Sequence, residues 1–479
     1  MQLTLGEVAA LLGTSCGSPE RVVRGYSIDS RTVVSGQLFF ALRGPRFDGH
    51  AFVRPALERG AAGAVVEAAF WRQAEPATAP TLVPVGNTLQ ALQQLGQAVR
   101  RKWGGRLAAV TGSTGKSTTK EMIAALLGRR WKVLKSPGNL NNHFGLPLAL
   151  LALEPHHEFA VMELAMSAAG EIARLAELAE PQIGVITNVA PVHLQFFDSV
   201  DAIARAKREL IDYLASRPGP VAAILNHDDP RVRKFGVGFN GHVVTFGFEE
   251  GADYRAAEVA TGKSVGSTFR VVAPGWDEEF VLPLPGRHNI QNALAALAVA
   301  SELSLPVNEA QHALAEFQNL HQRGEILTLP RGITVLNDSY NSNPLAMERM
   351  LETLAAWPGA RRRIVVAGEM LELGVTSPEL HRQIGRRCAR SRVAWLIAVQ
   401  GDARFFLEGA LEEGFAPEQT RFFDDATPAG EFCRTLIKPG DAVLVKGSRG
   451  VRLERVIELL AASRATSSDR SRKKSEAVD

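Results

Sequence analysis

The chain has 479 residues, of which 46% are hydrophobic and 22% are charged, and its net charge is +3. This length exceeds one ordinary hydrophobic core, so we expect a globular protein of two to four domains. The small net charge does not support nucleic-acid binding as the main function. Three widely separated cysteines without a CxxC pair argue against a zinc site or a disulfide framework.

No segment resembles a secretion signal or a membrane span. The N-terminal stretch MQLTLGEVAALLG lacks a basic region and a long apolar run, and it predicts a short strand followed by an amphipathic helix. No stretch approaches the ~18 consecutive apolar residues of a transmembrane helix. We therefore expect no membrane insertion and a cytoplasmic location.

Residues 1–104 mix short strands with helices. The segment DSRTVVSGQLFFALRG predicts a polar turn and then a strand at residues 38–42. The segment AFVRPALERGAAGAVVE predicts a helix that ends at Gly60, followed by a strand at residues 64–66. The helix within TLQALQQLGQAVRRKWG ends in basic residues and Gly104, and this stop also predicts a domain boundary.

Residues 105–318 alternate short apolar runs with helical segments. The runs LAAV, FAVMEL and IGVITNV, which begin at Leu107, Phe159 and Ile183, suit buried parallel strands. Alternating strands and helices predict a doubly wound α/β domain. The stretch HVVTFGFEEGADYRAAEV predicts a β-rich insertion within it.

Residues 319–464 repeat the strand-then-turn pattern in RRRIVVAGEML, VAWLIAVQG and DAVLVKGSRG, with helices between them. This pattern predicts a second, smaller α/β domain. Residues 465–479 are polar, charged and free of aromatic side chains, which predicts a disordered tail. Its basic cluster favours a solvated tail over a contact with an acidic surface.

The stretch VTGSTGKSTTKEM, which begins at Val110, resembles a phosphate-binding loop, although Val110 stands where the usual pattern has its first glycine. A buried strand precedes the loop and a helix follows it, as the motif requires. Gly112 and Gly115 allow a tight turn, Lys116 can bind the β- and γ-phosphates, and Ser117 can bind Mg²⁺. The alternative is a glycine-rich turn with an incidental lysine. The predicted nucleotide-binding residues are Thr111, Gly112, Ser113, Thr114, Gly115, Lys116, Ser117 and Thr118.

Two further polar side chains follow central strands. Glu163 ends the strand FAVMEL, and a carboxylate at the end of a parallel strand faces the ligand crevice. The alternative for Glu163 is a solvent-exposed strand end. His193 follows the next strand, in TNVAPVHL, where it could be a ligand or a structural histidine. Because bound ATP needs a metal with hard oxygen ligands, Glu163 is a candidate metal ligand.

Several motifs occur in one order along almost the whole chain, short of the tail: TGSTGKST, GNLNNHFGLPLALLAL, TNVAPVHL, AKREL, GRHNIQNALAA, NDSYNSNP, GEMLELG and VKGSRG. Together they resemble the Mur ligases, the ATP-dependent amide-forming enzymes of cytoplasmic peptidoglycan precursor synthesis, which are relatives of folylpolyglutamate synthase. The resemblance implies a three-domain architecture with a central doubly wound P-loop ATPase domain and smaller α/β N- and C-terminal domains. It also implies that Val110 is normal, because the loop of this family is a shortened variant.

The resemblance implies a catalytic centre in the middle domain. Lys116 and Ser117 are expected to hold ATP phosphates and, with Glu163, a first Mg²⁺, while His193 resembles a ligand of a second Mg²⁺. Lys207, in AKREL, matches the lysine that family members carbamylate with CO₂. Without the motif, Lys207 would be interpreted as a surface lysine on a helix. The expected catalytic residues are Lys116, His193 and Lys207.

Other roles are implied for the flanking segments. The uridine nucleotide is expected at Asp29, Ser30 and Arg31. Further contacts to the ATP nucleotide are expected at Asn289, Asn292, Arg323, Asp338, Tyr340 and Asn341. One departure is Ala165, where the family often has glycine, and its methyl group could tighten the site beside Glu163.

The segment YSIDSRTVVSGQLFFALRGPRFDGHAF resembles the uridine-nucleotide domain of two family members, and NDSYNSNP resembles the member that adds a dipeptide. The implied reaction ligates D-alanyl-D-alanine to UDP-N-acetylmuramoyl-tripeptide through an acyl phosphate, with ATP and Mg²⁺, in a monomeric enzyme. The alternatives are a sister ligase that adds the third amino acid or extends folate, and a non-catalytic nucleotide-binding relative. The DSR segment argues against folate as the substrate.

Overall fold

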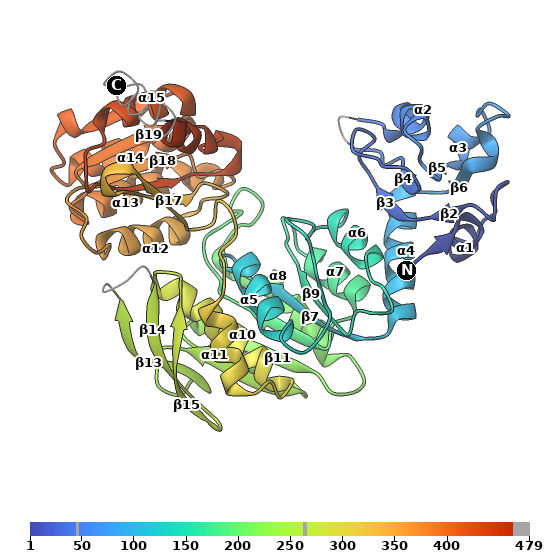
Figure 1. The fold of residues 1–479 in the computed structure, drawn as a ribbon, viewed down its shortest axis with the longest axis horizontal. Coiled ribbons are helices and arrows are strands. Elements are labelled where there is room, and N and C mark those ends of the chain that lie inside the picture. The colour runs from blue at the N-terminus through green and yellow to red at the C-terminus, as the bar shows by residue number, and fades with distance from the viewer. Residues whose placement is uncertain (45–46, 262–265, 463–479) are drawn as a thin grey trace, which may run out of the picture.

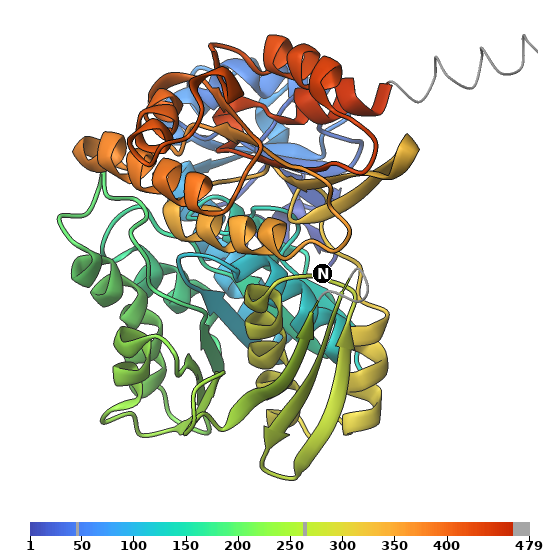
Figure 2. The same cartoon turned by 90° about the vertical axis from the view of Figure 1, so that its left-hand side faces the viewer.

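The computed structural model describes residues 1–44, 47–261 and 266–462, which form three α/β units in chain order (Figure 1). The tail predicted at residues 465–479 lies outside the described residues. Two views show the C-terminal unit stacked on the central unit, with its helix α12 facing the central unit (Figures 1 and 2). This three-unit architecture is the one that the resemblance implies.

The N-terminal unit contains a parallel sheet with the strand order β3-β4-β5-β6. Strands β4 and β5 confirm the two strands predicted here, although β4 ends at Phe40, before the predicted end. The N-terminal strand and helix are confirmed as β1 and α1, and Thr4 and Glu7 form a capping box at the start of α1. The elements are β1 (Leu3–Thr4), α1 (Leu5–Leu11), β2 (Val22–Val23), β3 (Gly25–Ser27), β4 (Gln37–Phe40), α2 (Val53–Glu58), β5 (Gly63–Glu67), α3 (Ala68–Trp71), β6 (Leu82–Val85) and α4 (Thr88–Trp103).

Helix α4 connects the N-terminal unit to the central unit. Its buried Leu92 and Leu95 belong to one hydrophobic cluster that also contains Phe40 of β4 and Leu150 of α6. The helix ends at Gly104, whose φ of 70° lies in the left-handed region that glycine tolerates. The hydrophobic core therefore continues across Gly104, the position where the helix stop predicts a domain boundary.

The central unit contains the strand order β15-β14-β13-β12-β11-β10-β7-β9-β8 among the described residues. From β8 to β12 the strands are parallel, and helices pack on both faces, which confirms the doubly wound prediction. The elements are β7 (Arg106–Thr111), α5 (Lys116–Leu127), β8 (Val133–Lys135), α6 (Gly145–Leu151), β9 (Phe159–Glu163), α7 (Glu171–Ala179), β10 (Ile183–Ile186), α8 (Val200–Ala215), β11 (Ala222–Asn226), α9 (Pro230–Arg233), β12 (His242–Gly247), β13 (Tyr254–Thr261), β14 (Ser267–Ala273), β15 (Trp276–Leu282), α10 (Arg287–Glu302) and α11 (Val307–Ala315).

The β-rich stretch after β11 is not an insertion that stands apart from the sheet. Strand β12 pairs in parallel with β11, and β13 pairs with β12, so the stretch continues the central sheet. Strands β13, β14 and β15 then pair antiparallel and form its edge. Their inward side chains Phe269 and Phe280 join the cluster of α5 and α10, which explains why this extension adds to the main core.

The C-terminal unit has the strand order β16-β17-β21-β18-β19-β20, in which only the edge strand β16 is antiparallel to its neighbour. The elements are β16 (Glu325–Leu329), β17 (Ile333–Asp338), α12 (Pro344–Ala355), β18 (Arg363–Gly368), α13 (Ser377–Arg390), β19 (Trp395–Val399), α14 (Arg404–Glu412), β20 (Thr420–Phe423), α15 (Ala426–Leu436) and β21 (Ala442–Lys446). This second α/β unit was predicted from the sequence. No helix in the described part of the chain is long and apolar enough to cross a membrane.

Candidate active site

A cavity of about 580 Å³ lies between the central and C-terminal units. The carboxyl ends of β7, β9 and β10 face it from the central unit, where parallel sheets usually bind ligands. Most residues predicted to bind nucleotide or metal line this cavity, whereas Thr111, Gly112 and Lys207 do not. The predicted lining residues are Ser113, Thr114, Gly115, Lys116, Ser117, Thr118, Glu163, His193, Asn289, Asn292, Arg323, Asp338, Tyr340 and Asn341.

The phosphate loop connects β7 to α5 and depends on its two glycines. Gly112 has a φ of 151°, and a Cβ atom there would lie 1.8 Å from the hydroxyl oxygen of Thr187. Gly115 has a φ of 82°, and a Cβ atom there would lie 2.4 Å from Oδ1 of Asn292. Any larger residue would therefore force the loop away from β10 or α10. The strand–loop–helix context predicted from the sequence is confirmed.

Residues that directly follow β10 hold the loop in place. The Asn188 side chain accepts a hydrogen bond from the Thr114 backbone N–H at 3.0 Å, and Thr187 donates its hydroxyl to the Thr114 carbonyl at 2.6 Å. The Ser113 hydroxyl accepts from the Ala190 N–H at 2.9 Å. Thr187 and Asn188 are not among the site residues predicted from the sequence. Their position directly after a central strand, beside His193 in TNVAPVHL, is the signal that could have identified them.

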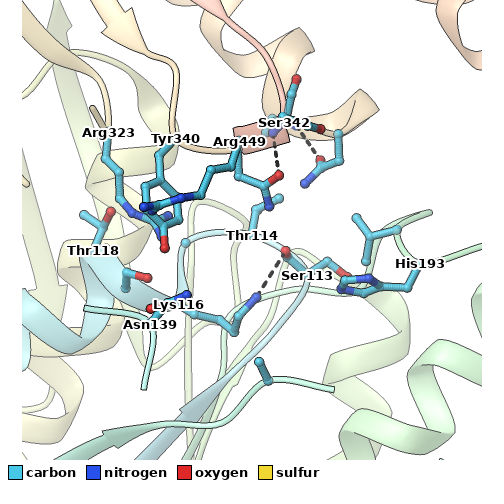
Figure 3. A pocket seen from close by; sticks show the side chains of 18 of the residues that line it. Ser113, Thr114, Lys116, Thr118, Asn139, His193, Arg323, Tyr340, Ser342 and Arg449 are labelled. Carbon is cyan, nitrogen blue, oxygen red and sulfur yellow. Dashed lines mark hydrogen bonds between the residues drawn. The ribbon is translucent and has the colours of Figure 1, made fainter. Parts of the chain in front are cut away.

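Lys116 folds back over the loop (Figure 3). Its Nζ donates to the Gly112 carbonyl at 2.9 Å and to the Ser113 carbonyl at 3.5 Å. Burial is the main cause that lowers the pKa of Lys116; Arg323 lowers it further, and Glu163 acts in the opposite direction. A phosphate anion in the cavity would favour the charged form of this amine.

Ser117 and Glu163 form the oxygen-rich part of the cavity. The Ser117 hydroxyl donates to Glu163 Oε2 at 2.6 Å, and the Asn141 amide donates to Glu163 Oε1 at 2.8 Å. A buried hydroxyl beside a carboxylate at a phosphate loop suits Mg²⁺, which usually takes few protein ligands and completes its shell with phosphate oxygens and water. Ala165 also lines the cavity, and its backbone does not need the left-handed conformation that would favour glycine.

Lys207 is buried in helix α8, where its side chain is 2% exposed. No hydrogen bond or ion pair to its amine exists among the described residues. Burial lowers the pKa of Lys207 well below its ordinary value, and repulsion from Lys116 adds to this shift. The structure thus excludes the surface-lysine alternative and places a buried amine with a lowered pKa within electrostatic reach of Lys116.

His193 lies where the central unit meets the C-terminal unit. Its Nδ1 is 2.5 Å from Oε2 of Glu372, and both residues line the cavity. This hydrogen bond is the main cause that lowers the pKa of Glu372. Glu372 lies in the motif GEMLELG but is not among the predicted site residues, because the contact joins segments that are distant in the chain.

The C-terminal unit supplies the opposite wall of the cavity. The guanidinium carbons of Arg323 and Arg449 lie 4.1 and 5.1 Å from the centre of the Tyr340 ring (Figure 3). The buried Lys446 amine donates to Asp338 Oδ2 at 2.5 Å and to the Asn341 carbonyl at 2.8 Å. The lysine, which lies at the end of β21, therefore fixes the β17 turn that carries three predicted nucleotide contacts. Lys446 belongs to the motif VKGSRG but is not among the predicted site residues.

Arg349 of α12 links the C-terminal unit directly to the phosphate loop. It donates to the Thr114 hydroxyl at 3.2 Å and to Oε1 of Gln291 in α10 at 3.2 Å. Burial lowers the pKa of Arg349, and nearby carboxylates act in the opposite direction. Arg349 was not identified from the sequence, since no local pattern distinguishes it from other helical arginines.

Asn289 lies in helix α10, which also carries Gln291. Its side chain donates to the Pro285 carbonyl at 2.8 Å.

Asp29, Ser30 and Arg31 lie in the N-terminal unit, on a turn after β3 and outside the cavity. Arg31 donates to Asp29 from its Nε at 2.9 Å and from a terminal nitrogen at 2.7 Å. These bonds are the first cause that lowers the pKa of Asp29 to about 2. The turn follows the carboxyl end of a parallel strand, so it lies at the edge where ligands bind.

Comparisons with known proteins identify a family. Its models, described as Mur ligase family catalytic domain, Mur ligase middle domain and Mur ligase glutamate ligase domain, match residues 22–103, 110–300 and 322–449. UDP-N-acetylmuramoyl-tripeptide–D-alanyl-D-alanine ligase from Bacillus subtilis is 33% identical over 465 residues, covering 96% of this chain and 98% of the relative. Among solved structures, MurF from Acinetobacter baumannii has a TM-score of 0.85 at 29% identity, covering 96% of this chain and 99% of that one. MurF ligase from Thermotoga maritima in complex with ADP has a TM-score of 0.79 at 29% identity, covering 92% and 97%.

Proposed function

The chain belongs to the Mur ligase family, and we propose that it ligates D-alanyl-D-alanine to UDP-N-acetylmuramoyl-tripeptide at the expense of ATP. The observation that carries this proposal is the cavity in which the phosphate loop, Ser117 and Glu163 face the wall formed by the C-terminal unit. Nearly full-length similarity to proteins named UDP-N-acetylmuramoyl-tripeptide–D-alanyl-D-alanine ligase or MurF supports the choice of substrates. The reaction belongs to peptidoglycan precursor synthesis, and we place it in the cytoplasm, in a monomeric enzyme.

The chemistry converts a poor electrophile into a reactive one. A carboxylate oxygen of the tripeptide attacks the γ-phosphorus of ATP, the bond to the β–γ bridging oxygen breaks, and ADP leaves. The neutral amine of the dipeptide then attacks the carbonyl carbon of the acyl phosphate. The new C–N bond forms, the C–O bond to phosphate breaks, and the amine loses its proton, so the products are the pentapeptide, ADP and phosphate.

The phosphate loop positions the triphosphate for this transfer. Backbone N–H groups at the start of α5 and the amine of Lys116 supply positive charge to the β- and γ-phosphates. Ser117 and Glu163 would hold the first Mg²⁺, and His193 would contribute to a second. When bound, Mg²⁺ neutralises phosphate oxygens and lowers the repulsion between the two anionic substrates.

Lys207 is proposed to carry a carbamate. Its neutral amine would attack the carbon of CO₂, form one N–C bond while one C–O π bond becomes a carboxylate, and release one proton, which turns a buried neutral amine into an anionic side chain. The burial of the amine and its lack of a partner among the described residues support this proposal. Intact-mass measurement in bicarbonate buffer should show the added mass of one CO₂, and Lys207→Met should abolish it.

The three units would divide the substrates among them. We propose a uridine-nucleotide domain at residues 1–104, an ATP domain at residues 105–318 and a domain at residues 319–464 that closes over ATP and brings the dipeptide. In the first, the substrate contacts would be Asp29, Ser30 and Arg31. In the third, Arg323, Asp338, Tyr340 and Asn341 would contact the base and ribose of ATP. A cavity built from two units also limits the access of water to the acyl phosphate.

The proposal is tested by phosphate release from ATP and Mg²⁺ in the presence of UDP-N-acetylmuramoyl-tripeptide, with and without D-alanyl-D-alanine. We expect release that requires both substrates and a pentapeptide product identified by mass. Release that requires a single amino acid in place of the dipeptide would instead identify a sister ligase. Lack of release with any substrate pair would overturn the proposed ligase activity.

A further inference from the structure

Two cavity residues from different units contact each other, and both have an uncommon backbone conformation. His193 has a φ of 56° and Glu372 has a φ of 64°, both in the left-handed region that non-glycine residues rarely adopt. Their side chains meet with 2.5 Å between Nδ1 and Oε2. Backbone conformations of this kind cost free energy and persist where the surrounding structure enforces them. The meeting of these two side chains is therefore a built feature of the fold.

The backbones around the pair are fastened as well. The Gln195 N–H donates to the Glu372 carbonyl at 3.1 Å. A Cβ atom on Gly374 would lie 3.1 Å from Cα of Gln195, so glycine allows the two chains to approach closely. A backbone contact between the central and C-terminal units thus positions the Glu372 carboxylate beside His193.

The carboxylate determines which nitrogen of His193 carries a proton. An ionised carboxylate only accepts hydrogen bonds, so the nitrogen that faces it, Nδ1, is the donor. In a neutral imidazole, Nε2 is then unprotonated and can accept a proton or ligate a cation. No hydrogen bond to Nε2 of His193 exists in the described part of the chain. The Glu372 contact therefore prepares Nε2 for an interaction in the cavity.

We propose that Glu372 is a positioning residue that orients His193 and fixes its Nδ1–H tautomer when the C-terminal unit docks on the central unit. The inference rests on the proposed function for its catalytic consequence. An isolated exposed ion pair would contribute little to the stability of the fold. Here the pair lies in the wall of the cavity and joins two units, so its loss should affect turnover more than stability. Carboxylates that accept from the second nitrogen of a ligating histidine act in this way in many metal sites.

The test compares Glu372→Ala with Glu372→Gln, because a glutamine side-chain oxygen can still accept from Nδ1–H. The matched control is Glu408→Ala, which removes an exposed carboxylate of the same unit that pairs with Arg382 at 2.8 Å, away from the cavity. Nitrogen-15 chemical shifts of His193 in the substrate-free protein report its tautomer. Steady-state phosphate release reports kcat and KM for each substrate.

We expect wild type, Glu372→Gln and Glu408→Ala to show the Nδ1–H tautomer, and Glu372→Ala to show a mixture with Nε2–H. Glu372→Ala should lower kcat by roughly 10- to 100-fold with smaller changes in KM, and Glu372→Gln should recover most of this loss. Unchanged tautomer and unchanged kcat in Glu372→Ala would overturn the proposal, as would equal losses in the alanine and glutamine variants. Because the tautomer is measured without substrates, a failure of the proposed ligase activity would be seen separately in the wild-type assay.

Discussion

Charged side chains of the same types occur on the surface of helices α13 and α14 and at the cavity between the units, but their environments differ. Along α13, three arginines spaced one helical turn apart pair with glutamates at α14: Arg382–Glu408, Arg386–Glu412 and Arg390–Glu413, at 2.8, 2.7 and 2.7 Å. These pairs are accessible to solvent. In contrast, Glu163 at the cavity and Lys207 beside it are buried, and Lys207 has no partner among the described residues.

The difference shows where charge is kept for chemistry. In an exposed pair, each charged group exchanges some contacts with water for a contact with its partner. Such a pair therefore contributes little to stability. A buried amine or carboxylate loses its hydration, which destabilises the fold unless partners compensate. The burial of Lys207 and Glu163 is therefore best explained by the carbamate and the Mg²⁺ that they are proposed to hold. Four substitutions sharpen this contrast.

Lys116→Ala should have the largest effect. The variant removes the positive charge proposed to stabilise the transferred phosphoryl group, so phosphate release should fall by roughly 10²- to 10³-fold or more. Lys234→Ala, which removes an exposed lysine of the same unit, should retain the wild-type rate. A near-normal rate for Lys116→Ala would disprove the assignment of the phosphate loop.

Gly115→Ala should have the next largest effect on ATP binding. A Cβ atom would lie 2.4 Å from Asn292 Oδ1, so the loop must shift, and ATP affinity should fall by about 10- to 100-fold, or ~1–3 kcal/mol. The matched control is Gly170→Ala, which has the same φ of 82° but no atom within 4 Å of the new Cβ. The control should lose about 1 kcal/mol of stability and bind ATP normally. Equal ATP affinities, measured by calorimetry, would show that the close approach to Asn292 is unimportant.

Lys207→Met should separate stability from activity. The folded-state pKa of Lys207 lies well below the unfolded value of ~10.4, so between these values the unfolded chain binds more protons. Wild-type stability therefore rises with pH across this window, and the variant lacks that dependence. In CO₂-free buffer near pH 7, we expect a melting temperature about 2–4 °C higher than wild type, with the difference shrinking towards pH 10.

The same variant should lose ligase activity, because it cannot form the proposed carbamate. Lys234→Met provides the comparison for an exposed lysine, and its melting temperature should match the wild type at every pH. A destabilised Lys207→Met at neutral pH would indicate that the buried amine has favourable contacts in the native state.

Glu412→Ala should have the smallest effect. The substitution removes one of the three exposed ion pairs between α13 and α14. The free energy of unfolding of the C-terminal unit should therefore fall by ~0.5 kcal/mol or less, with unchanged phosphate release. Raising the salt concentration should reduce even this difference. A loss above about 1.5 kcal/mol in chemical denaturation would show that the three pairs act as a network.

Local patterns allowed much of this molecule to be predicted from its sequence. The strand–loop–helix around Lys116 follows from apolar runs and glycine spacing within a few residues, and Glu163 follows from its position at a strand end. The stop at Gly104 was also predicted correctly, because a helix with a left-handed terminal residue is a local event.

Contacts between distant segments could not be predicted in the same way. Arg349 reaches Thr114, and Glu372 reaches His193, only because the C-terminal unit docks on the central one. The β-rich stretch was identified as strands, but its continuation of the central sheet depends on pairing across the fold. Family motifs marked some of these segments without showing which side chains touch.

Helix α4 gives the molecule fewer folding units than its three α/β units suggest. One hydrophobic cluster runs from α1 through α4 into α6, α7 and α8, whereas the C-terminal sheet is surrounded by its own separate clusters. Segments that share a core lose their structure together, and segments with separate cores can melt independently. Differential scanning calorimetry of the full chain should therefore resolve two transitions rather than three. The N-terminal and central units would unfold together as one cooperative unit, and the C-terminal unit would unfold in a separate transition.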